Sequence, residues 1–245
     1  MLKHLLFFSL ILLFTSAGRG QEILLTLTDG KILKTKDISI EKNGDILFLH
    51  SKINSYMLLP RHLLKKMDYP KPESLKKADL LFRQKKYKES AFLYEKSSGK
   101  LKNISPWEEY SIYHAANAIL LTGDREKAFE LLTAFPAVKK ITITEETREE
   151  YCKILLFLAQ LYMGKKEYGP IYPLLDKLIS SPKEIFAAQA LFMKGEALFQ
   201  EKKFQKSLDC FSLYLLIFPD AGYSKKAEEY CKILREKLSG RMKKE

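Results

Sequence analysis

The sequence contains few of the residues that interrupt helices or build metal and redox centres. Glycine and proline number 11 and 9 in 245 residues, which favours helices over a β-sandwich or barrel. The three cysteines, Cys152, Cys210 and Cys231, lie far apart with no CxxC pair, so neither a zinc site nor a thioredoxin-like site is predicted. Buried free thiols are the default interpretation. A Cys210–Cys231 bridge between neighbouring helices is the alternative in an oxidising compartment.

Catalytic motifs are also absent from the sequence. The histidines, His4, His50, His62 and His114, are scattered, and no HExxH, GxSxG, P-loop or GxGxxG pattern occurs. No cysteine–histidine or serine–histidine–acid arrangement of a nucleophile and its base stands out. We therefore predict a non-enzymatic protein with no catalytic residue, no cofactor and no metal.

Acidic residues are outnumbered by basic ones, 30 to 42, which leaves a formal net charge of +12. Because acids are interleaved with the lysines, solvated helix faces are the simplest interpretation. The alternative is a basic binder of an envelope polymer or an anionic membrane surface. Nucleic acid is not expected, because the chain begins with an export signal.

Residues 1–20 read MLKHLLFFSLILLFTSAGRG and are typical of a signal peptide. Lys3 and His4 precede an apolar run from Leu5 to Phe14, and small residues follow. A spanning helix needs about twenty apolar residues, so we predict cleavage between Ala17 and Gln21 and no transmembrane span in the mature chain. The mature protein, with Lys3 and Arg19 gone, keeps 12 − 2 = +10 charges. It is expected to be periplasmic or secreted, including at the periphery of the outer membrane.

Residues 21–70 show a strand-like pattern and are predicted to form a small β-rich domain. The segments EILLTLT, KILKTKDISI, DILFLH and SYMLLP are strand candidates, and Asp29-Gly30 and Asn43-Gly44 are hairpin signals between them. Three or four short strands in a curled sheet or partial barrel are expected. Pro70 and Pro72 mark its end.

Residues 71–240 are predicted to form a helical repeat domain, because their apolar residues follow a period of about 3.6. Four units share a small residue, a bulky residue three places on, a small or apolar residue twelve places on, and an aromatic residue or leucine four places later. The sets are Ala78, Leu81, Ser90, Tyr94; Ala116, Ile119, Ala128, Leu132; Ala159, Tyr162, Ile171, Leu175; and Gly195, Leu198, Ser207, Phe211. Small residues allow two antiparallel helices to cross closely. No pair buries its apolar face alone, so neighbouring pairs must stack.

This pattern resembles the tetratricopeptide repeat (TPR) family over residues 73–219. The best match is LFMKGEALFQEKKFQKSLDCFSLYLLIFPDA, which keeps Gly195, Phe204, Ser207 and Pro219. The first and third units depart from the pattern, and in the third Pro170 and Pro173 delay the second helix. The spacings of the small residues are 38, 43 and 36, longer than the family period of about 34, and loops such as 135–144 account for the excess.

The resemblance implies a mostly α fold, a TPR-like α-solenoid of about four helical hairpins. One more helix, around Tyr223 to Leu238, would cap it, and residues 241–245 would form a basic tail. With the export signal, the segment FPDAGYSKKAEEYCKIL is similar to envelope-associated repeat proteins of diderm bacteria, which help to assemble or coordinate the outer membrane and cell division.

In TPR arrays the first helix of each pair lines a groove that binds a protein or peptide partner. The matching positions form the predicted groove: Leu75, Asp79, Phe82, Tyr113, Asn117, Leu156, Gln160, Phe192, Glu196 and Phe199. Such a surface suits an extended or helical peptide. Only Asn117 matches the family's carboxylate clamp, so that specialised function is not predicted. A structural subunit that adds strands of the β-rich head to a neighbour is the other alternative.

Overall fold

The computed structural model describes residues 22–41, 44–135 and 149–240. The predicted signal peptide, most of the 135–144 loop and the basic tail lie outside these ranges. The chain divides into two compact units, Met1–Glu108 and Glu109–Glu245, and each is described by itself. The division falls inside a helix, whereas the change from strand to helix occurs earlier, between Asp68 and Glu73.

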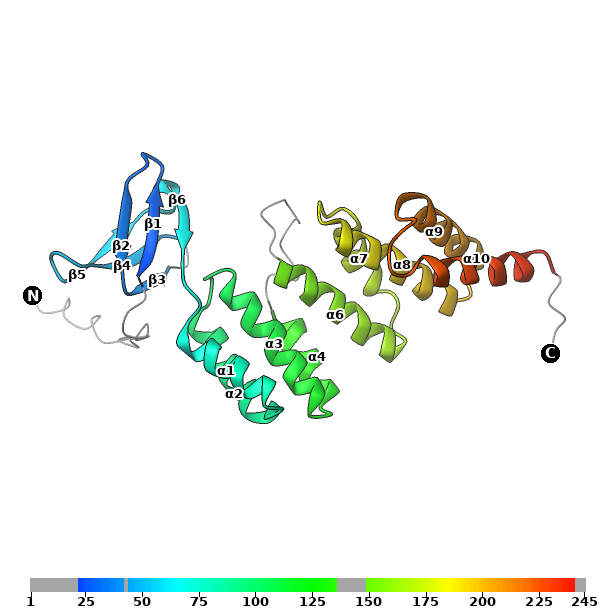
Figure 1. Cartoon of the computed structure of the whole chain (residues 1–245), viewed down its shortest axis with the longest axis horizontal. Helices are drawn as coiled ribbons and strands as arrows, with labels where there is room; N and C mark the ends of the chain where they lie inside the picture. The colour runs from blue at the N-terminus through cyan, green and yellow to red at the C-terminus, as the bar shows by residue number, and fades with distance from the viewer. Residues whose placement is uncertain (1–21, 42–43, 136–148, 241–245) are drawn as a thin grey trace, which may run out of the picture. The chain divides into compact units, whose positions relative to one another are not determined.

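The first unit begins with six strands, which form two three-stranded antiparallel sheets (Figure 1). Their bounds are β1 Ile23–Leu27, β2 Ile32–Thr35, β3 Ile38–Ile40, β4 Ile46–His50, β5 Ser55–Leu59 and β6 Leu64–Asp68. The strand orders are β2-β1-β6 and β3-β4-β5. Alternate apolar residues of the central strands β1 and β4 are buried, so this small region has a core of its own, made of Ile23, Leu25, Ile38, Ile46, Phe48, Leu59 and Leu64.

The β-rich head therefore has more strands than the three or four expected from the sequence. The segment KILKTKDISI bends after Thr35 and contributes two strands instead of one. The sixth strand, LKKMD, shows no alternation strong enough to predict it, because three of its five residues are charged. It forms because β1 offers it an open edge, with Leu25 opposite Met67.

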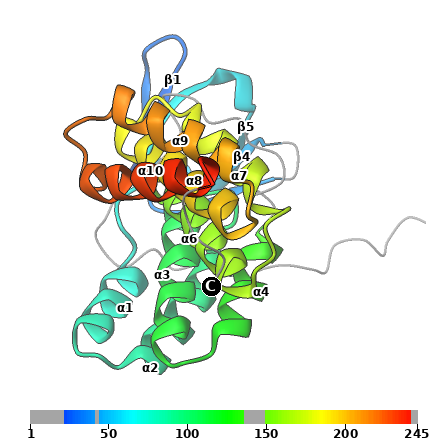
Figure 2. The same ribbon diagram turned by 90° about the vertical axis from the view of Figure 1, so that its right-hand side faces the viewer.

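The rest of the described chain is helical, in the pairs expected from the repeats (Figures 1 and 2). The bounds are α1 Glu73–Arg83, α2 Tyr87–Lys100, α3 Trp107–Leu121, α4 Arg125–Ala134, α6 Glu149–Lys165, α7 Ile171–Ile179, α8 Glu184–Gln200, α9 Phe204–Ile217 and α10 Ser224–Leu238. The hairpin α1–α2 belongs to the first unit, α3 spans the division, and the others belong to the second. Pro170 precedes the short α7, as the sequence predicts.

The small residues of the four repeats are buried, and in the first and fourth pairs they lie where the two helices cross. Ala78, Ala116, Ala159 and Gly195 are all buried. In the first pair the buried Ser90 hydroxyl donates a hydrogen bond to the Ala78 carbonyl oxygen, 2.9 Å away. In the fourth pair Ser207 makes the same bond to Gly195, at 2.8 Å. The twelve-residue spacing thus corresponds to the same contact in the first and fourth repeats.

The turn inside each pair also repeats. Seven residues after each small residue the backbone adopts a left-handed conformation, with φ angles of 59° at Lys85, 91° at Gly123, 59° at Lys166 and 62° at Lys202. A left-handed residue ends a helix by turning the next N–H back onto its last carbonyls. Lys86, Glu167 and Lys203 do this in three pairs, each donating to the carbonyl five residues earlier. Only the second pair has glycine at this position.

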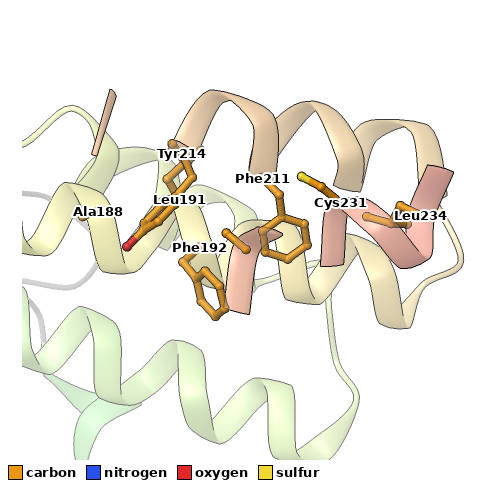
Figure 3. Packing of buried hydrophobic residues seen from close by; sticks show 8 residues of the cluster. Ala188, Leu191, Phe192, Phe211, Tyr214, Cys231 and Leu234 are labelled. Carbon is orange, nitrogen blue, oxygen red and sulfur yellow. The ribbon is translucent and has the colours of Figure 1, made fainter. Parts of the chain in front are cut away.

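The helix α10 packs against α9, which also packs against α8 (Figures 1 and 2). Its buried residues Ala227, Cys231 and Leu234 join a core cluster with Phe211 and Tyr214 of α9 and with Ala188, Leu191 and Phe192 of α8. Figure 3 shows the ring of Phe211 between Phe192 and Cys231. The predicted capping helix is therefore confirmed, and its exposed face is charged.

Candidate functional site

The second unit has a pocket of about 790 Å³ at the end of the α8–α9 hairpin, next to the segment that leads to α10. The first turns of α8 contribute Glu184, Ile185, Ala188 and Gln189, and α9 contributes Tyr214. The connecting segment contributes Phe218, Ala221, Gly222 and Tyr223. These nine residues are called the α8–α9 pocket below.

The segment after α9 is held in place by backbone and hydroxyl bonds. The Phe218 N–H donates to the Tyr214 carbonyl at 2.8 Å, and the Ser224 hydroxyl donates to the Ala221 carbonyl at 2.8 Å. Pro219 follows Phe218, and because proline lacks an N–H it cannot continue the helix. The segment therefore leaves α9 sharply and forms one wall of the pocket.

Two tyrosines connect this wall to the core. The backbone N–H of Tyr223 donates to the hydroxyl oxygen of Tyr214 at 3.3 Å. The ring of Tyr223 stacks on Phe192, with centroids 4.6 Å apart and planes 17° apart. Because Phe192 is in the core cluster, the pocket wall rests on well-packed aromatic residues.

The lining is mostly apolar, with two polar side chains from α8. Glu184 is the one carboxylate among the lining residues, and Gln189 adds an amide. Ile185 is 65% exposed and lies at the rim, while Ala188 is buried. Such a lining suits an aliphatic or aromatic side chain, and the carboxylate favours a cation beside it.

The ten residues of the predicted groove are placed in different environments. Leu75, Leu156 and Phe192 are 0%, 7% and 2% exposed, so they pack between helices. Gln160 is exposed, and the rest are half-buried: Asp79, Phe82, Tyr113, Asn117, Glu196 and Phe199. The first three of the ten lie in the first unit and the others in the second.

Several half-buried groove residues contact their own neighbours. Asp79 accepts hydrogen bonds from Tyr94 and Lys71 at 2.6 and 2.5 Å. The ring of Tyr113 packs edge-on against Phe157, with centroids 6.1 Å apart.

In the fourth repeat, Glu196 and Phe199 both contact side chains of α10. Lys226 donates to Glu196 at 2.7 Å, and Tyr230 packs on Phe199 with centroids 5.2 Å apart. Phe192 also packs against Tyr230, at 6.2 Å, and through Tyr223 it lies behind the α8–α9 pocket.

Sequence reasoning missed the pocket residues. The available signal was the apolar content of the segment after α9, where Phe218, Ala221 and Tyr223 surround a proline and a glycine. Their meaning depends on the facing first turn of α8, more than thirty residues earlier. The spacing of one repeat therefore could not reveal it.

The described residues hold no group of three or more histidine, cysteine, aspartate or glutamate side chains placed to bind a metal ion. Cys152, Cys210 and Cys231 are separate thiols. Burial raises the pKa of the Cys152 and Cys210 thiols, which lowers their thiolate content and their reactivity. Across the described ranges, no helix is both long and apolar enough to span a bilayer.

These helical pairs define a protein with a TPR-like repeat fold, and a solved structure with TPR-like repeats agrees. A kinesin light chain-type protein of Podosopora anserina with nearly identical TPR-like repeats matches with a TM-score of 0.50 and 14% identity, over 69% of this chain and 86% of that one. A structure of MamA (AMB-1) is similar with a TM-score of 0.48 and 19% identity, over 68% of this chain and 81% of that one. No protein-family model and no curated protein matches the sequence. The similarity is therefore one of fold.

Proposed function

We propose that this chain is a protein–protein interaction scaffold, and that its α8–α9 pocket binds an apolar side chain of a protein or peptide partner. The observation that carries the proposal is the pocket itself. Its volume of about 790 Å³ falls in the range of about 300–1,000 Å³ that is typical of binding sites. TPR-like repeats present such surfaces on rigid helices.

The partner segment is expected to carry an aliphatic or aromatic anchor residue with a basic residue nearby. The anchor would contact Ile185, Phe218 and Tyr223, which surround the pocket. The basic residue would lie near Glu184, the one carboxylate of the lining. An extended or helical peptide can present both groups.

Glycine 222 offers a direct test of the pocket. A Cβ atom added there would meet no atom within 4 Å, and the backbone needs no left-handed conformation. Gly222→Phe should therefore fold normally while it fills the pocket. Gly169 is equally open and does not line the pocket, so Gly169→Phe is the matched control.

The experiment selects peptides from a random displayed library on the mature chain and measures their affinities by fluorescence anisotropy. Peptides with an apolar anchor and a neighbouring base should dominate. Their affinity should fall about tenfold or more on Gly222→Phe, the loss of one buried anchor, and stay unchanged on Gly169→Phe. Selected peptides that bind Gly222→Phe as tightly as the wild type would refute the pocket as the binding site.

Export to the cell envelope is the second part of the proposal, and residues 1–20 support it. The experiment is to express the full chain in a diderm bacterium and to determine the N-terminus of the protein in the periplasmic and cytoplasmic fractions. A periplasmic protein that starts between residues 18 and 21 is expected. An intact N-terminus on a protein confined to the cytoplasm would contradict export.

A further inference from the structure

The β-rich head has four sheet edges, and three of them carry features that prevent further pairing. The β2 edge carries Lys34, which forms an ion pair with Glu22 at 3.2 Å. The β6 edge is charged and its pairing with β1 is interrupted by a bulge, while β3 is only three residues long. Charges, bulges and short length are the usual means by which proteins protect sheet edges.

The fourth edge, β5, has none of these features. Its sequence is SYMLL, with no charge and no proline. It pairs with β4 in one continuous register, from Ile46 opposite Leu59 to His50 opposite Ser55. An unprotected edge of this length is a template for another strand.

Hydrogen bonds of β4 show which backbone groups of β5 point outward. The Leu49 N–H donates to Asp37 on the β3 side at 3.0 Å, and the Glu41 N–H donates to Asp45 at 2.8 Å. Backbone groups alternate sides along a strand, so Phe48 and His50 bond to β5 through Met57 and Ser55.

The N–H and C=O groups of Tyr56 and Leu58 therefore point away from β4. Among the described residues, no backbone group donates a hydrogen bond to these C=O groups or accepts one from these N–H groups.

The side chains of this edge are apolar on both faces. Tyr56, Met57 and Leu58 are 40%, 42% and 56% exposed. The Tyr56 hydroxyl donates to the Asp37 carboxylate at 2.5 Å, which holds the ring across the outer face of the sheet. An added strand with apolar residues on one face would pack them beside Tyr56 and Leu58, and would extend the apolar surface that these two residues form with Leu49 and Leu47 of β4.

Charges at the two ends of β5 indicate what kind of strand fits. Lys52 precedes the strand and Arg61 and His62 follow it, and all three are exposed. A second copy in antiparallel pairing centred on Met57 would bring the end of one β5 that carries Lys52 near the end of the other β5 that carries Arg61. Like charges would then meet at both ends, which opposes self-pairing.

We propose that β5 binds an extended segment of another protein as an added strand, and that this segment is apolar at alternate positions and acidic at its ends. The main-chain bonds come from Tyr56 and Leu58, and the acidic ends face Lys52 and Arg61. This site is independent of the α8–α9 pocket, so either proposal can fail alone.

The probe is a pair of synthetic peptides with the same alternating valine–threonine centre, one with glutamates at both ends and one with lysines. Binding to the mature chain is measured by fluorescence anisotropy at two salt concentrations. The acidic peptide should bind several-fold more tightly, and salt should reduce the difference. Equal affinities, or tighter binding of the lysine peptide, would refute the proposed chemistry.

Two proline variants test the edge itself. Leu58→Pro removes an outward N–H without removing a bond to β4, and should weaken the acidic peptide about tenfold. Ile32→Pro is the matched control: Ile32 is 58% exposed, and its N–H also points outward, because the Leu27 N–H donates to Lys31. It should leave binding unchanged, and equal losses in both variants would refute the β5 site.

Two further measurements do not depend on the folding of a proline variant. Bound acidic peptide should slow amide hydrogen exchange at Tyr56 and Leu58 more than at Met57, and Lys52→Glu should shift the preference toward the lysine peptide. Uniform protection, or an unchanged preference, would count against strand addition.

Light scattering completes the test: dimerisation that Leu58→Pro abolishes would assign the edge to a second copy and overturn the proposed occupant.

Discussion

The first and fourth repeats solve one packing problem with different residues. Both cross at a small residue whose carbonyl accepts a serine hydroxyl, Ser90 to Ala78 and Ser207 to Gly195. The first repeat then has Tyr94, whose hydroxyl donates to Asp79. The fourth has Phe211, which occupies the space that a side chain at position 195 would need.

This difference shows that the repeat conserves a contact and not a residue. In the fourth repeat, the ring of Phe211 on α9 packs directly against Gly195 on α8. The middle repeats have alanine and leucine at these two positions: Ala116 with Leu132, and Ala159 with Leu175. The predictions below test this interpretation, starting with the largest effect.

Removing the ring of the fourth repeat should have the largest effect. Phe211 is fully buried and stacks on Tyr230, with centroids 4.6 Å apart and planes 4° apart. Phe211→Ala should lower the free energy of unfolding by about 3–5 kcal/mol, because it leaves a cavity. Guanidinium unfolding followed by circular dichroism measures the loss.

The single tryptophan provides the control for this variant. Trp107 lies in the first unit, where its indole N–H donates to the Tyr69 carbonyl at 2.7 Å. The unfolding midpoint followed by Trp107 fluorescence should be unchanged in Phe211→Ala and should fall in Tyr94→Ala. Equal shifts of that transition in both variants would contradict local packing within each repeat.

Enlarging the small residue of the fourth repeat should have the next largest effect. An added Cβ at Gly195 would lie 2.7 to 2.8 Å from ring carbons of Phe211. Gly195→Ala should therefore cost about 1–3 kcal/mol through overpacking. Adding Phe211→Leu recreates the alanine–leucine pair of the middle repeats, and the double variant should be less destabilised than the sum of the single ones. Simple additivity would argue against a direct contact.

The serine bonds should contribute less, and equally in both repeats. Ser90→Ala and Ser207→Ala each remove a buried hydroxyl from a carbonyl oxygen, which should cost about 0.5–1.5 kcal/mol. Ser239 is exposed and bonds only within its own turn, so Ser239→Ala is the control and should be neutral. Chemical denaturation of all three variants measures these costs. A neutral result at only one of the two buried serines would show that the bond is not equivalent in the two repeats.

The left-handed turn residues offer a smaller and opposite effect. Lysine is strained in this conformation, whereas glycine is not. Lys85→Gly and Lys202→Gly should each stabilise the protein by roughly 0.5–1 kcal/mol, and Gly123→Ala should destabilise it by about 1 kcal/mol. Thermal unfolding measures the shifts. Destabilisation by both lysine replacements would indicate that the side chains, not the backbone, decide these positions.

The smallest expected effect is a pH dependence from one hydrogen bond, between Tyr172 of the third repeat and Glu201 of the fourth. A hydrogen bond from the Tyr172 hydroxyl lowers the pKa of Glu201 below its ordinary value of 4.5, whereas the equivalent residue of the first repeat is Gln84. A lowered folded-state pKa stabilises the protein above the ordinary value, and this contribution disappears as the pH falls through the lowered pKa.

Tyr172→Phe should therefore lose stability relative to the wild type at neutral pH, and the difference should shrink in acid. Unfolding midpoints measured between neutral pH and about pH 3 test this. A difference that grows in acid would have the wrong sign for this bond.

The helical repeats could be predicted well from the sequence, and the β-rich head less well. Helix pairs follow from local spacing, because the residues that meet at a crossing, such as Gly195 and Ser207, are only twelve positions apart. The strand β6 depends on a partner about forty positions away and has a charged sequence. Its pairing could not be inferred from its own pattern.

The groove residues show the same limit on a finer scale. Spacing placed Phe192 and Glu196 on the first helix of the fourth repeat, but Phe192 packs beneath Tyr223 and Glu196 pairs with Lys226. Both contacts come from beyond the repeat. Which side of a helix is covered depends on the next element, and the repeat pattern does not encode that element.

The sequence by itself determined the TPR-like helical pairs, their small-residue crossings and the final helix α10, because each depends on residues close together along the chain. Only the tertiary structure decided that the α8–α9 pocket forms and that β5 is the unprotected edge. Both features depend on which surfaces remain exposed after segments distant in the sequence have packed together. Local periodicity contains no information about the surface that such packing leaves open.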